Sequence, residues 1–193
     1  MIYLKNVSVP NLCDAGAKLL KDIKPINTDQ KIVYGEAITV KTKSDDWGTS
    51  VKSISYGKNK IIVVSCNNDD FAVWGGLATL NAKIKGVKGV VIDGSVRDLE
   101  EINKLKFPIF SKSTCAIAGK PKNEGNINVS INISNVVINP GDIIVGDCNG
   151  VVVIEKNKIE EILNNVKLIK RKEGNIRKKI MNGFDLEEIL KLY

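Results

Sequence analysis

The stretch that decides the fold is VVIDGSVRDLEEI, residues 90–102, where a run of aliphatic residues gives way to glycine and then to charged side chains. Consecutive valine and isoleucine are typical of a strand buried on both faces. Acidic residues at 98, 100 and 101 suit the first turn of a helix, where the helix dipole favours negative charge. The stretch therefore predicts a buried strand that ends at residues 93–94 and a helix over residues 97–105.

The segments on either side repeat this alternation of strand and helix. Upstream, KIIVVSC at residues 60–66 predicts another buried strand, and DDFAVWGGLATLNAKIKG, residues 69–86, is expected to be helical at least from Gly76 onward. Downstream, PIFSK at residues 108–112 predicts a third strand. Strands joined by a crossover helix run parallel. The sequence therefore predicts an α/β fold with central parallel β-α-β units.

The N-terminal third predicts a helix and one further strand region. Residues 11–23 carry leucine and isoleucine at helical spacing, which predicts an amphipathic helix whose apolar face holds Leu12, Leu19, Leu20 and Ile23. KIVYGEAITVKT, residues 31–42, predicts either a strand pair or one bent strand, with the break at Gly35.

The pattern of apolar and turn residues changes after Lys120. Short apolar segments separated by Asn, Pro-Gly and Asn-Gly turns predict an antiparallel β meander; they lie at residues 127–132, 136–142, 143–150 and 151–156. A helical extension is expected from about residue 156, with Asp185 and Glu188 as a capping box for the last helix. We expect residues 1–193 to form a single compact domain with flanking helices.

Composition excludes several kinds of protein. The 193 residues carry a formal net charge of +7, 43% hydrophobic residues and no histidine. Catalysis that depends on imidazole is therefore excluded. The four cysteines lie far apart, which predicts no cysteine and histidine zinc site and favours buried reduced thiols. No apolar run is long enough to span a membrane and the N-terminus lacks a secretory signal, so we expect a cytoplasmic protein without membrane association.

Two segments have the features of an anion-binding site. WGGLA, residues 74–78, places two glycines at a helix start, where free backbone amides and the dipole favour an anion. DGSVRD, residues 93–98, follows the next strand of the unit. Ligands of open α/β sheets gather where strands end and helices begin. We expect both segments to line one pocket.

The second segment offers two chemically distinct groups. Arg97 is one of only three arginines in a lysine-rich chain, and its guanidinium can grip a carboxylate with two hydrogen bonds. Asp98 supplies a hard oxygen ligand for Mg²⁺ or Mn²⁺, and Glu101, one turn on, could hold a water of such an ion. A small 2-oxo acid suits this pair of groups. The alternative is that these charges form only a solvated helix start.

Four motifs together resemble the RraA-like family, named for the regulator of ribonuclease E activity A. They are YGEAITVK, the segment from Trp74 to Ile102 with the following FPIF, NPGD and GDCNGVVVI. This family also contains 4-hydroxy-4-methyl-2-oxoglutarate aldolases and oxaloacetate decarboxylases. The resemblance spans residues 14–154 and implies a swivelling-type α/β domain, a divalent metal, and homotrimers or hexamers with active sites between subunits.

The resemblance also implies a role for each residue of the site. Arg97 would bind the substrate carboxylate and keto oxygen, Asp98 would ligate the metal directly, and Glu101 would lie in its water shell. The pyruvyl carboxylate would be held by the amides of the glycine loop, formed by Gly75, Gly76, Leu77 and Ala78.

Position 76 departs from the aldolase pattern. Aldolase-type members resemble one another in having an aspartate, then twenty residues and then Arg-Asp, whereas this chain has Gly76 in place of the aspartate. Retro-aldol cleavage needs a base for the alcohol proton, and decarboxylation does not. Gly76 therefore favours oxaloacetate decarboxylation over aldol cleavage, unless Asp69 or Asp70 reaches the pocket.

The expected function is a metal-dependent lyase that forms pyruvate from a small 2-oxo acid through a metal-stabilised enolate. The alternative is a catalytically weak regulatory protein of the same fold that binds a ribonuclease or helicase. Residues 167–179 carry seven basic residues and one acidic one, which favours a solvated helix face. Aromatic residues make up 5% of the chain, so nucleic acid is not the expected partner.

Overall fold

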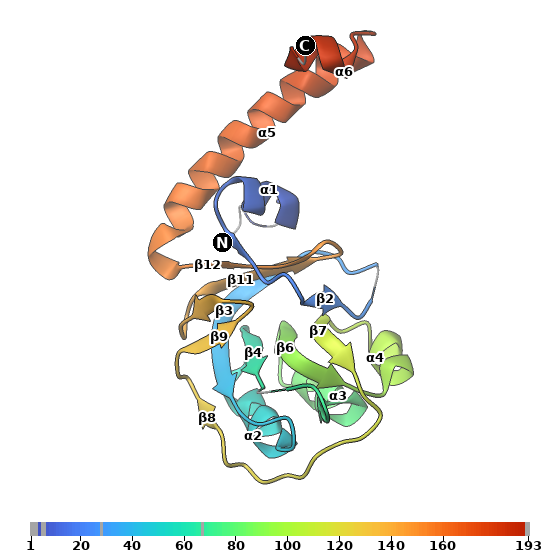
Figure 1. Cartoon of the computed structure of the whole chain (residues 1–193), viewed down its shortest axis with the longest axis vertical. Coiled ribbons are helices and arrows are strands. Elements are labelled where there is room, and N and C mark those ends of the chain that lie inside the picture. The colour runs from blue at the N-terminus through green and yellow to red at the C-terminus, as the bar shows by residue number, and fades with distance from the viewer. Residues whose placement is uncertain (1–3, 5–6, 28, 67, 192–193) are drawn as a thin grey trace.

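The computed structural model describes residue 4 and residues 7–27, 29–66 and 68–191. One curled mixed sheet with flanking helices forms the body, and a long helix stands out from it (Figure 1). The strand order is β1-β12-β11-β3-β4-β6-β7-β2, with β5 beside β6 and β8 beside β3. This arrangement confirms the α/β fold class.

The bounds of the elements are as follows. The strands are β1 Lys18–Leu19, β2 Lys24–Pro25, β3 Val33–Lys41, β4 Ile61–Ser65, β5 Ala72–Trp74, β6 Gly89–Val96, β7 Ile109–Thr114, β8 Asn126–Ile127, β9 Ile131–Ile133, β10 Val136–Ile138, β11 Ile143–Asp147 and β12 Gly150–Ile154. The helices are α1 Val9–Asp14, α2 Trp47–Lys52, α3 Gly76–Ile84, α4 Leu99–Leu105, α5 Ile159–Met181 and α6 Leu186–Leu190, with 3-10 turns at Ser53–Tyr56 and Lys156–Lys158.

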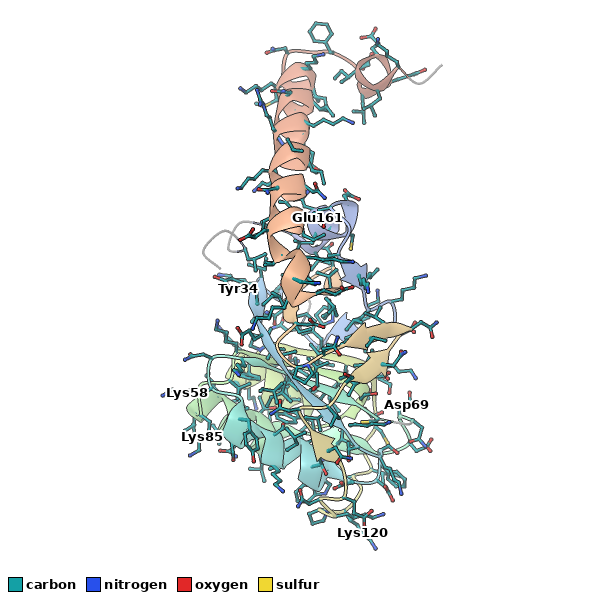
Figure 2. All side chains as sticks on the ribbon, turned by 90° about the vertical axis from the view of Figure 1, so that its left-hand side faces the viewer. Tyr34, Lys58, Asp69, Lys85, Lys120 and Glu161 are labelled. Carbon is teal, nitrogen blue, oxygen red and sulfur yellow. The ribbon has the colours of Figure 1, made fainter. Side chains whose placement is uncertain are left out.

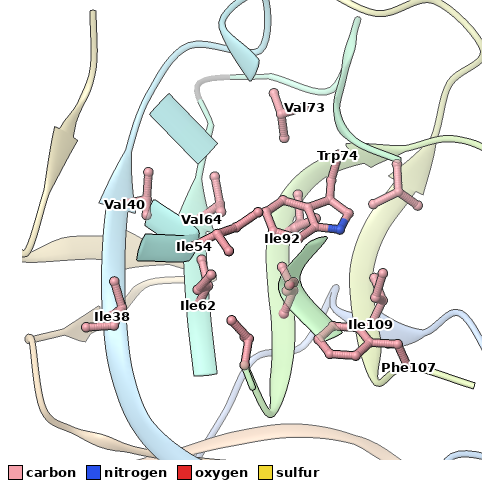
Figure 3. Packing of buried hydrophobic residues seen from close by; sticks show 14 of the residues in the cluster. Ile38, Val40, Ile54, Ile62, Val64, Val73, Trp74, Ile92, Phe107 and Ile109 are labelled. Carbon is pink, nitrogen blue, oxygen red and sulfur yellow. The ribbon is translucent and has the colours of Figure 1, made fainter. Parts of the chain in front are cut away.

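The centre of the sheet is the parallel part that the sequence predicts. Strands β3, β4, β6 and β7 pair in parallel, with α3 connecting β4 to β6 and α4 connecting β6 to β7. The side chains of Val64 and Ile92 pack with Trp74 in the core beneath α2 and α3 (Figure 3). Aliphatic residues on both strand faces are buried because a second cluster covers the opposite face of the sheet.

Strand β3 is one continuous strand. Its first half pairs antiparallel with β11 up to Glu36, and its second half pairs parallel with β4 from Ala37 onward. The change of partner comes just after Gly35. The strand therefore joins the antiparallel and parallel parts of the sheet, and the strand-pair alternative is wrong.

Strand β6 continues further than its sequence predicts. It runs through residues 93–94 to Val96, where it pairs with Thr114 of β7. A Cβ at Gly94 would lie 3.0 Å from the Cys66 sulfur, so glycine lets the strand pass this side chain without ending. The expected end at residues 93–94 is wrong, and the charged residues begin directly after the strand.

The helix expected over residues 11–23 is wrong in its second half. Helix α1 ends at Asp14, and Gly16 has a φ of 102°. The amides of Gly16 and Ala17 donate to the carbonyls of Cys13 and Leu12, the pattern of a glycine-terminated helix end. After this turn β1 pairs with β12 and the chain delivers further apolar side chains, including Leu20 and Ile23, to the core.

The region after Lys120 forms two hairpins in place of one meander. β9 pairs with β10 in a separate small sheet, whereas β11 pairs with β12 in the large sheet. Ser134 and Asn135 both have positive φ, which is the geometry of a tight hairpin turn. The meander was wrong because the two hairpins find different partners.

Helix α5 leaves the body of the molecule (Figures 1 and 2). Ile162 and Val166 are its buried residues, and the seven basic side chains between residues 167 and 179 are exposed. This confirms the predicted solvated face. Asp185 is the N-cap residue of α6, but its side chain makes no capping hydrogen bond, so the predicted capping box is not formed. No helix in the described ranges has the length and apolarity that a membrane span needs.

The four cysteines are free thiols, as expected, but they are not all buried. Cys66 lies in the core, and burial, together with the nearby carboxylates of Asp93 and Asp46, raises the pKa of its thiol to about 12. Cys148 is exposed, and Cys13 and Cys115 are half-buried. The expectation of buried thiols is therefore correct for Cys66 and wrong for Cys148.

Candidate active site

The glycine loop, residues 75–78, lies where β5 passes into α3. Gly75 is the N-cap residue of α3, and the Thr79 hydroxyl donates to its carbonyl at 2.8 Å. The indole N–H of Trp74 donates to the same hydroxyl at 3.0 Å. Two buried side chains, Trp74 and Thr79, therefore fix the start of the loop.

Arg97 and Asp98 reach the loop from the end of β6. The Arg97 amide donates to the Trp74 carbonyl at 3.1 Å, which fixes the two segments side by side. The Gly76 amide donates to Asp98 Oδ2 at 3.1 Å, and Arg97 Nε lies 3.6 Å from the same oxygen. The structure thus brings the two predicted segments together, as the sequence analysis expected.

Asp98 has an unusual backbone conformation. Its φ and ψ are 60° and 43°, in the left-handed region, and it stands at the N-terminal end of α4 without a capping hydrogen bond of its own side chain. Aspartate is among the few residues that adopt this conformation readily. The turn directs the carboxylate back to the glycine loop, away from the helix that it precedes.

A side chain at either glycine would displace a neighbouring carboxylate. A Cβ at Gly75 would lie 2.6 Å from Asp98 Oδ2 and 3.2 Å from Arg97 Cγ. A Cβ at Gly76 would overlap the carboxylate of Glu101. Glu101 therefore fills the space next to residue 76 with its own carboxylate, although neither Gly76 nor Glu101 is among the described residues that line the cavity beside the glycine loop.

The two acids considered as substitutes for residue 76 lie elsewhere. Asp69 Oδ2 accepts a hydrogen bond from the Ser113 hydroxyl at 2.9 Å, and the Asp70 carbonyl accepts one from the Cys115 thiol. Neither residue lines the cavity next to the glycine loop. The sequence analysis did not anticipate that Glu101 would take this place, since contact between residues 76 and 101 depends on the packing of α3 against α4.

A cavity of about 350 Å³ opens beside the loop. Arg97 and Asp98 form its charged end. Its remaining lining is mostly apolar and consists of Trp47, Val51, Ala72, Val73, Trp74, Gly75, Leu77, Ala78, Asn81 and Ala118. Trp74 is 3% exposed and packs in the core (Figure 3), as predicted, and it also lines the cavity.

Helix α2 supplies the wall opposite the glycine loop, and Asp46 fixes this helix. The carboxylate of Asp46 is buried and caps α2 through the amides of Gly48 and Thr49. It also accepts hydrogen bonds from the amides of Asn123 and Glu124, at 2.8 and 3.0 Å, and from two threonine hydroxyls. Asp46 thereby joins α2 to the long segment that carries Ala118.

Two other buried aspartates have structural roles. Asp142 accepts hydrogen bonds from the amides of Asn139 and Lys156, and Asp147 accepts them from the amides of Val9 and Asn149. Both roles agree with the predicted turns.

Asp98, at the cavity, and Glu101, against the glycine loop, suit a hydrated Mg²⁺ or Mn²⁺ better than zinc. Over the described residues there is no group of three or more His, Cys, Asp or Glu side chains that could enclose a metal. Mg²⁺ is commonly held by one or two carboxylates and keeps several waters. Asp98 could be the direct ligand, with Glu101 beside it, because both carboxylates reach adjacent residues of the glycine loop.

Comparison with known proteins identifies the family and supports the fold. Residues 9–153 match the family model RraA-like, described as Aldolase/RraA, and the chain belongs to the RraA-like family. An uncharacterized protein of Methanocaldococcus jannaschii is 60% identical over all of this chain and 94% of its own length. A protein of Halalkalibacterium halodurans named "Putative 4-hydroxy-4-methyl-2-oxoglutarate aldolase" is 36% identical over 83% of this chain and 79% of its own.

A solved structure shows the same fold. Streptomyces coelicolor RraAS2, described as an unusual member of the RNase ES inhibitor RraA protein family, superposes with a TM-score of 0.79. The superposition covers 91% of this chain and 94% of that chain at 23% identity. At this identity the likeness concerns the fold alone.

Proposed function

We propose that the chain is a divalent-metal-dependent carbon–carbon lyase that releases pyruvate from a small 2-oxo acid, with oxaloacetate decarboxylation ahead of aldol cleavage. The observation that carries this proposal is the meeting of Arg97, Asp98 and the glycine loop at one end of a cavity. The aldolase name of the 36% identical relative supports it.

The residues of the site have separate tasks in this reaction. Arg97 and the amides of the glycine loop would bind and orient the carboxylate next to the keto group. Asp98 would hold Mg²⁺ or Mn²⁺ directly, with Glu101 in contact through water. When bound, the ion would supply a Lewis acid for the keto oxygen.

Decarboxylation of oxaloacetate makes the smaller demand on these residues. The C3–C4 bond breaks, its electron pair moves into the C2–C3 bond, and C4 leaves as carbon dioxide. C3 then takes a proton to give pyruvate.

The test of the proposal is pyruvate release from oxaloacetate by the purified protein. We expect turnover above a blank that contains metal alone, with Mg²⁺ or Mn²⁺, and its loss when EDTA is added. 4-Hydroxy-4-methyl-2-oxoglutarate is assayed in parallel. Turnover of neither substrate above the blank would reject the lyase proposal.

Glu101 is proposed as the proton carrier for aldol cleavage, since its carboxylate occupies the space at position 76. We expect Glu101→Gln to lower aldol cleavage by about a hundredfold, a typical contribution of general acid–base catalysis. Oxaloacetate decarboxylation, which needs no base for an alcohol proton, should fall only by about tenfold, the smaller effect of losing an outer-shell partner of the metal. Both rates are measured by coupled detection of pyruvate.

The matched control is Glu100→Gln. Glu100 is the exposed neighbour of Glu101 and pairs with Lys104 on the same helix. It should leave both rates unchanged. Equal losses of the two activities in Glu101→Gln would contradict a role specific to the alcohol proton.

We also propose that the chain assembles into homotrimers or hexamers through α3. Leu77, Leu80 and Ile84 lie on one face of this helix, and Leu77 and Ile84 are 79% and 74% exposed. Exposed apolar faces of this kind mark interfaces. A second copy packed on this face would lie beside the cavity, to which Leu77 belongs.

Light scattering coupled to size exclusion tests the assembly. The chain is expected to elute with at least three times its monomer mass, and Ile84→Glu should shift it to the monomer. Lys85→Glu, the adjacent change, should keep the oligomer. A monomeric parent protein would reject the assembly proposal without bearing on the chemistry of the site.

The alternative function is a regulatory protein that binds a ribonuclease or a helicase. On sequence alone this alternative is favoured by Gly76, because the regulator members resemble this chain in lacking an acidic residue there. The Glu101 carboxylate lies next to Gly76, so the absence of an acid at position 76 favours the regulatory alternative less strongly.

A further inference from the structure

We infer that the cavity selects a 2-oxo acid with an apolar tail, so that the reaction it serves is cleavage of a 4-hydroxy-2-oxo acid into pyruvate and an apolar aldehyde. This inference rests on the proposed lyase function and names the substrate class of the same site. Oxaloacetate tests the chemistry, because its decarboxylation needs no base, but the cavity has the lining for another kind of molecule.

The charges of the cavity match one carboxylate. Arg97 is the one basic side chain among the described residues that line it. Arg97 also lies 3.6 Å from Asp98, so part of its charge is already compensated. A dicarboxylate would bring a second carboxylate against the opposite wall, and burying a charge without a partner is costly.

The opposite wall is apolar. It includes Trp47 and Val51 of α2 and Ala118. The cavity volume of about 350 Å³ is in the range of roughly 300–1,000 Å³ that binds ligands of drug size. Such a space exceeds what the four carbons of oxaloacetate need. It leaves room for an aliphatic or aromatic group beyond C4, which aromatic and aliphatic side chains would bind by excluding water.

The atoms and electrons of the proposed cleavage balance. The C3–C4 bond of the 4-hydroxy-2-oxo acid breaks, the C4 hydroxyl gives its proton to the Glu101 carboxylate, and C4 becomes the aldehyde carbon. The electron pair moves into the C2–C3 bond, and C3 takes a proton to give pyruvate. No oxidant or reductant is needed.

Binding of uncleavable analogues tests the inference independently of turnover. 4-Phenyl-2-oxobutanoate and 2-oxoglutarate both lack the 4-hydroxyl group, and they differ in carrying a phenyl group or a carboxylate at C4. Titration calorimetry with Mg²⁺ present should give at least a tenfold lower Kd for the phenyl compound. Equal affinity, tighter binding of 2-oxoglutarate, or no measurable binding of either would overturn the inference.

A matched pair of variants tests the wall itself. Val51 is half-buried at the cavity, and a lysine there can keep its stem in the wall while its ammonium group enters the cavity. Val51→Lys is expected to shift the Kd ratio about tenfold toward 2-oxoglutarate, and Val51→Met, of similar length without charge, should not. An unchanged ratio in folded Val51→Lys, checked by circular dichroism, would overturn the assignment of the wall.

Turnover separates this inference from the lyase proposal. Pyruvate release is compared for 4-hydroxy-2-oxo-4-phenylbutanoate and 4-hydroxy-2-oxoglutarate. Preferred cleavage of the phenyl substrate supports both proposals. Preferred cleavage of the dicarboxylate overturns the inference of an apolar tail but supports the lyase proposal. Tighter binding of the phenyl analogue without turnover of any substrate supports the ligand class and rejects the lyase.

Discussion

Asp98→Asn is expected to lower metal-dependent pyruvate release from oxaloacetate by at least about a hundredfold. Even the outer-shell partners of metal ligands contribute about 10- to 100-fold, and Asp98 is the one carboxylate among the described residues that line the cavity. The loss should appear in kcat, and Mn²⁺ binding followed by electron paramagnetic resonance should weaken in parallel.

Asparagine is the informative replacement because of the backbone at this position. Residue 98 has a φ of 60°, and asparagine tolerates the left-handed region as aspartate does. Its side-chain oxygen can still accept the hydrogen bond from the Gly76 amide. The variant therefore removes the charge and retains the turn, whereas Asp98→Ala would remove both.

Asp70→Asn is the control for a general effect of charge. Asp70 is exposed and lies outside the lining of the cavity. Its variant should keep the activity and the Mn²⁺ affinity of the parent. Turnover in Asp98→Asn close to that of Asp70→Asn would contradict the placement of the metal at Asp98.

The parallel core of the fold was predictable because its signal is local. Strands buried on both faces need aliphatic residues at successive positions, and a crossover helix needs glycine or acidic residues at its start. Arg97 and Asp98 follow β6 directly, so their approach to the glycine loop follows from the β-α-β unit alone.

Segments whose partners lie far along the chain were predicted less well. Leu12, Leu19, Leu20 and Ile23 have helical spacing, yet only the first lies in α1, because β12 supplies the hydrogen bonds of a strand after Gly16. Sequence periodicity shows which side chains are apolar. It does not show that the edge of β12, more than a hundred residues later, is available to pair with this segment.

The cavity wall was missed for the same reason. Trp47 and Ala118 meet because Asp46 and the backbone of residues 119–120 join two distant segments. A local signal for α2 does exist: Asp46 precedes Gly48 and Thr49, whose amides it caps. That signal predicts the start of a helix and gives no indication of which cavity the helix faces.

Asp46→Ala is expected to lower the free energy of unfolding by about 3–5 kcal/mol. Asp46 is 1% exposed, and its loss would leave the amides of Asn123 and Glu124 and the hydroxyls of Thr42 and Thr49 without their acceptor. Each buried donor without a partner costs about 1–3 kcal/mol. Urea unfolding at pH 7 measures the change. Asp45→Ala, which removes the adjacent acid and its contact with Lys122, should cost much less.

The same carboxylate makes stability depend on pH in a defined direction. Burial acts to raise the pKa of Asp46, but hydrogen bonds from Thr49, from the amides of Asn123 and Glu124, and from Thr42 outweigh burial and hold the pKa well below its usual range. An unfolded aspartate has a pKa of about 3.9. Because the folded pKa is the lower one, this stabilisation is present above about pH 4 and is lost as the pH falls toward the folded value.

Asp46→Asn separates the charge from the shape of the side chain. The variant should be less stable than the parent at pH 7, and the difference should shrink as the pH falls from 5 to 3, because only in the parent does the unfolded chain then take up a proton at this side chain. Urea unfolding at each pH gives the difference directly. A difference in unfolding free energy that stays constant over this range would show that the charge of Asp46 does not stabilise the fold.

Asp46 also fixes α2, which carries Trp47 and Val51 of the cavity wall. The folded Asp46→Asn variant should therefore bind 4-phenyl-2-oxobutanoate more weakly than the parent, because these two side chains lose their fixed position.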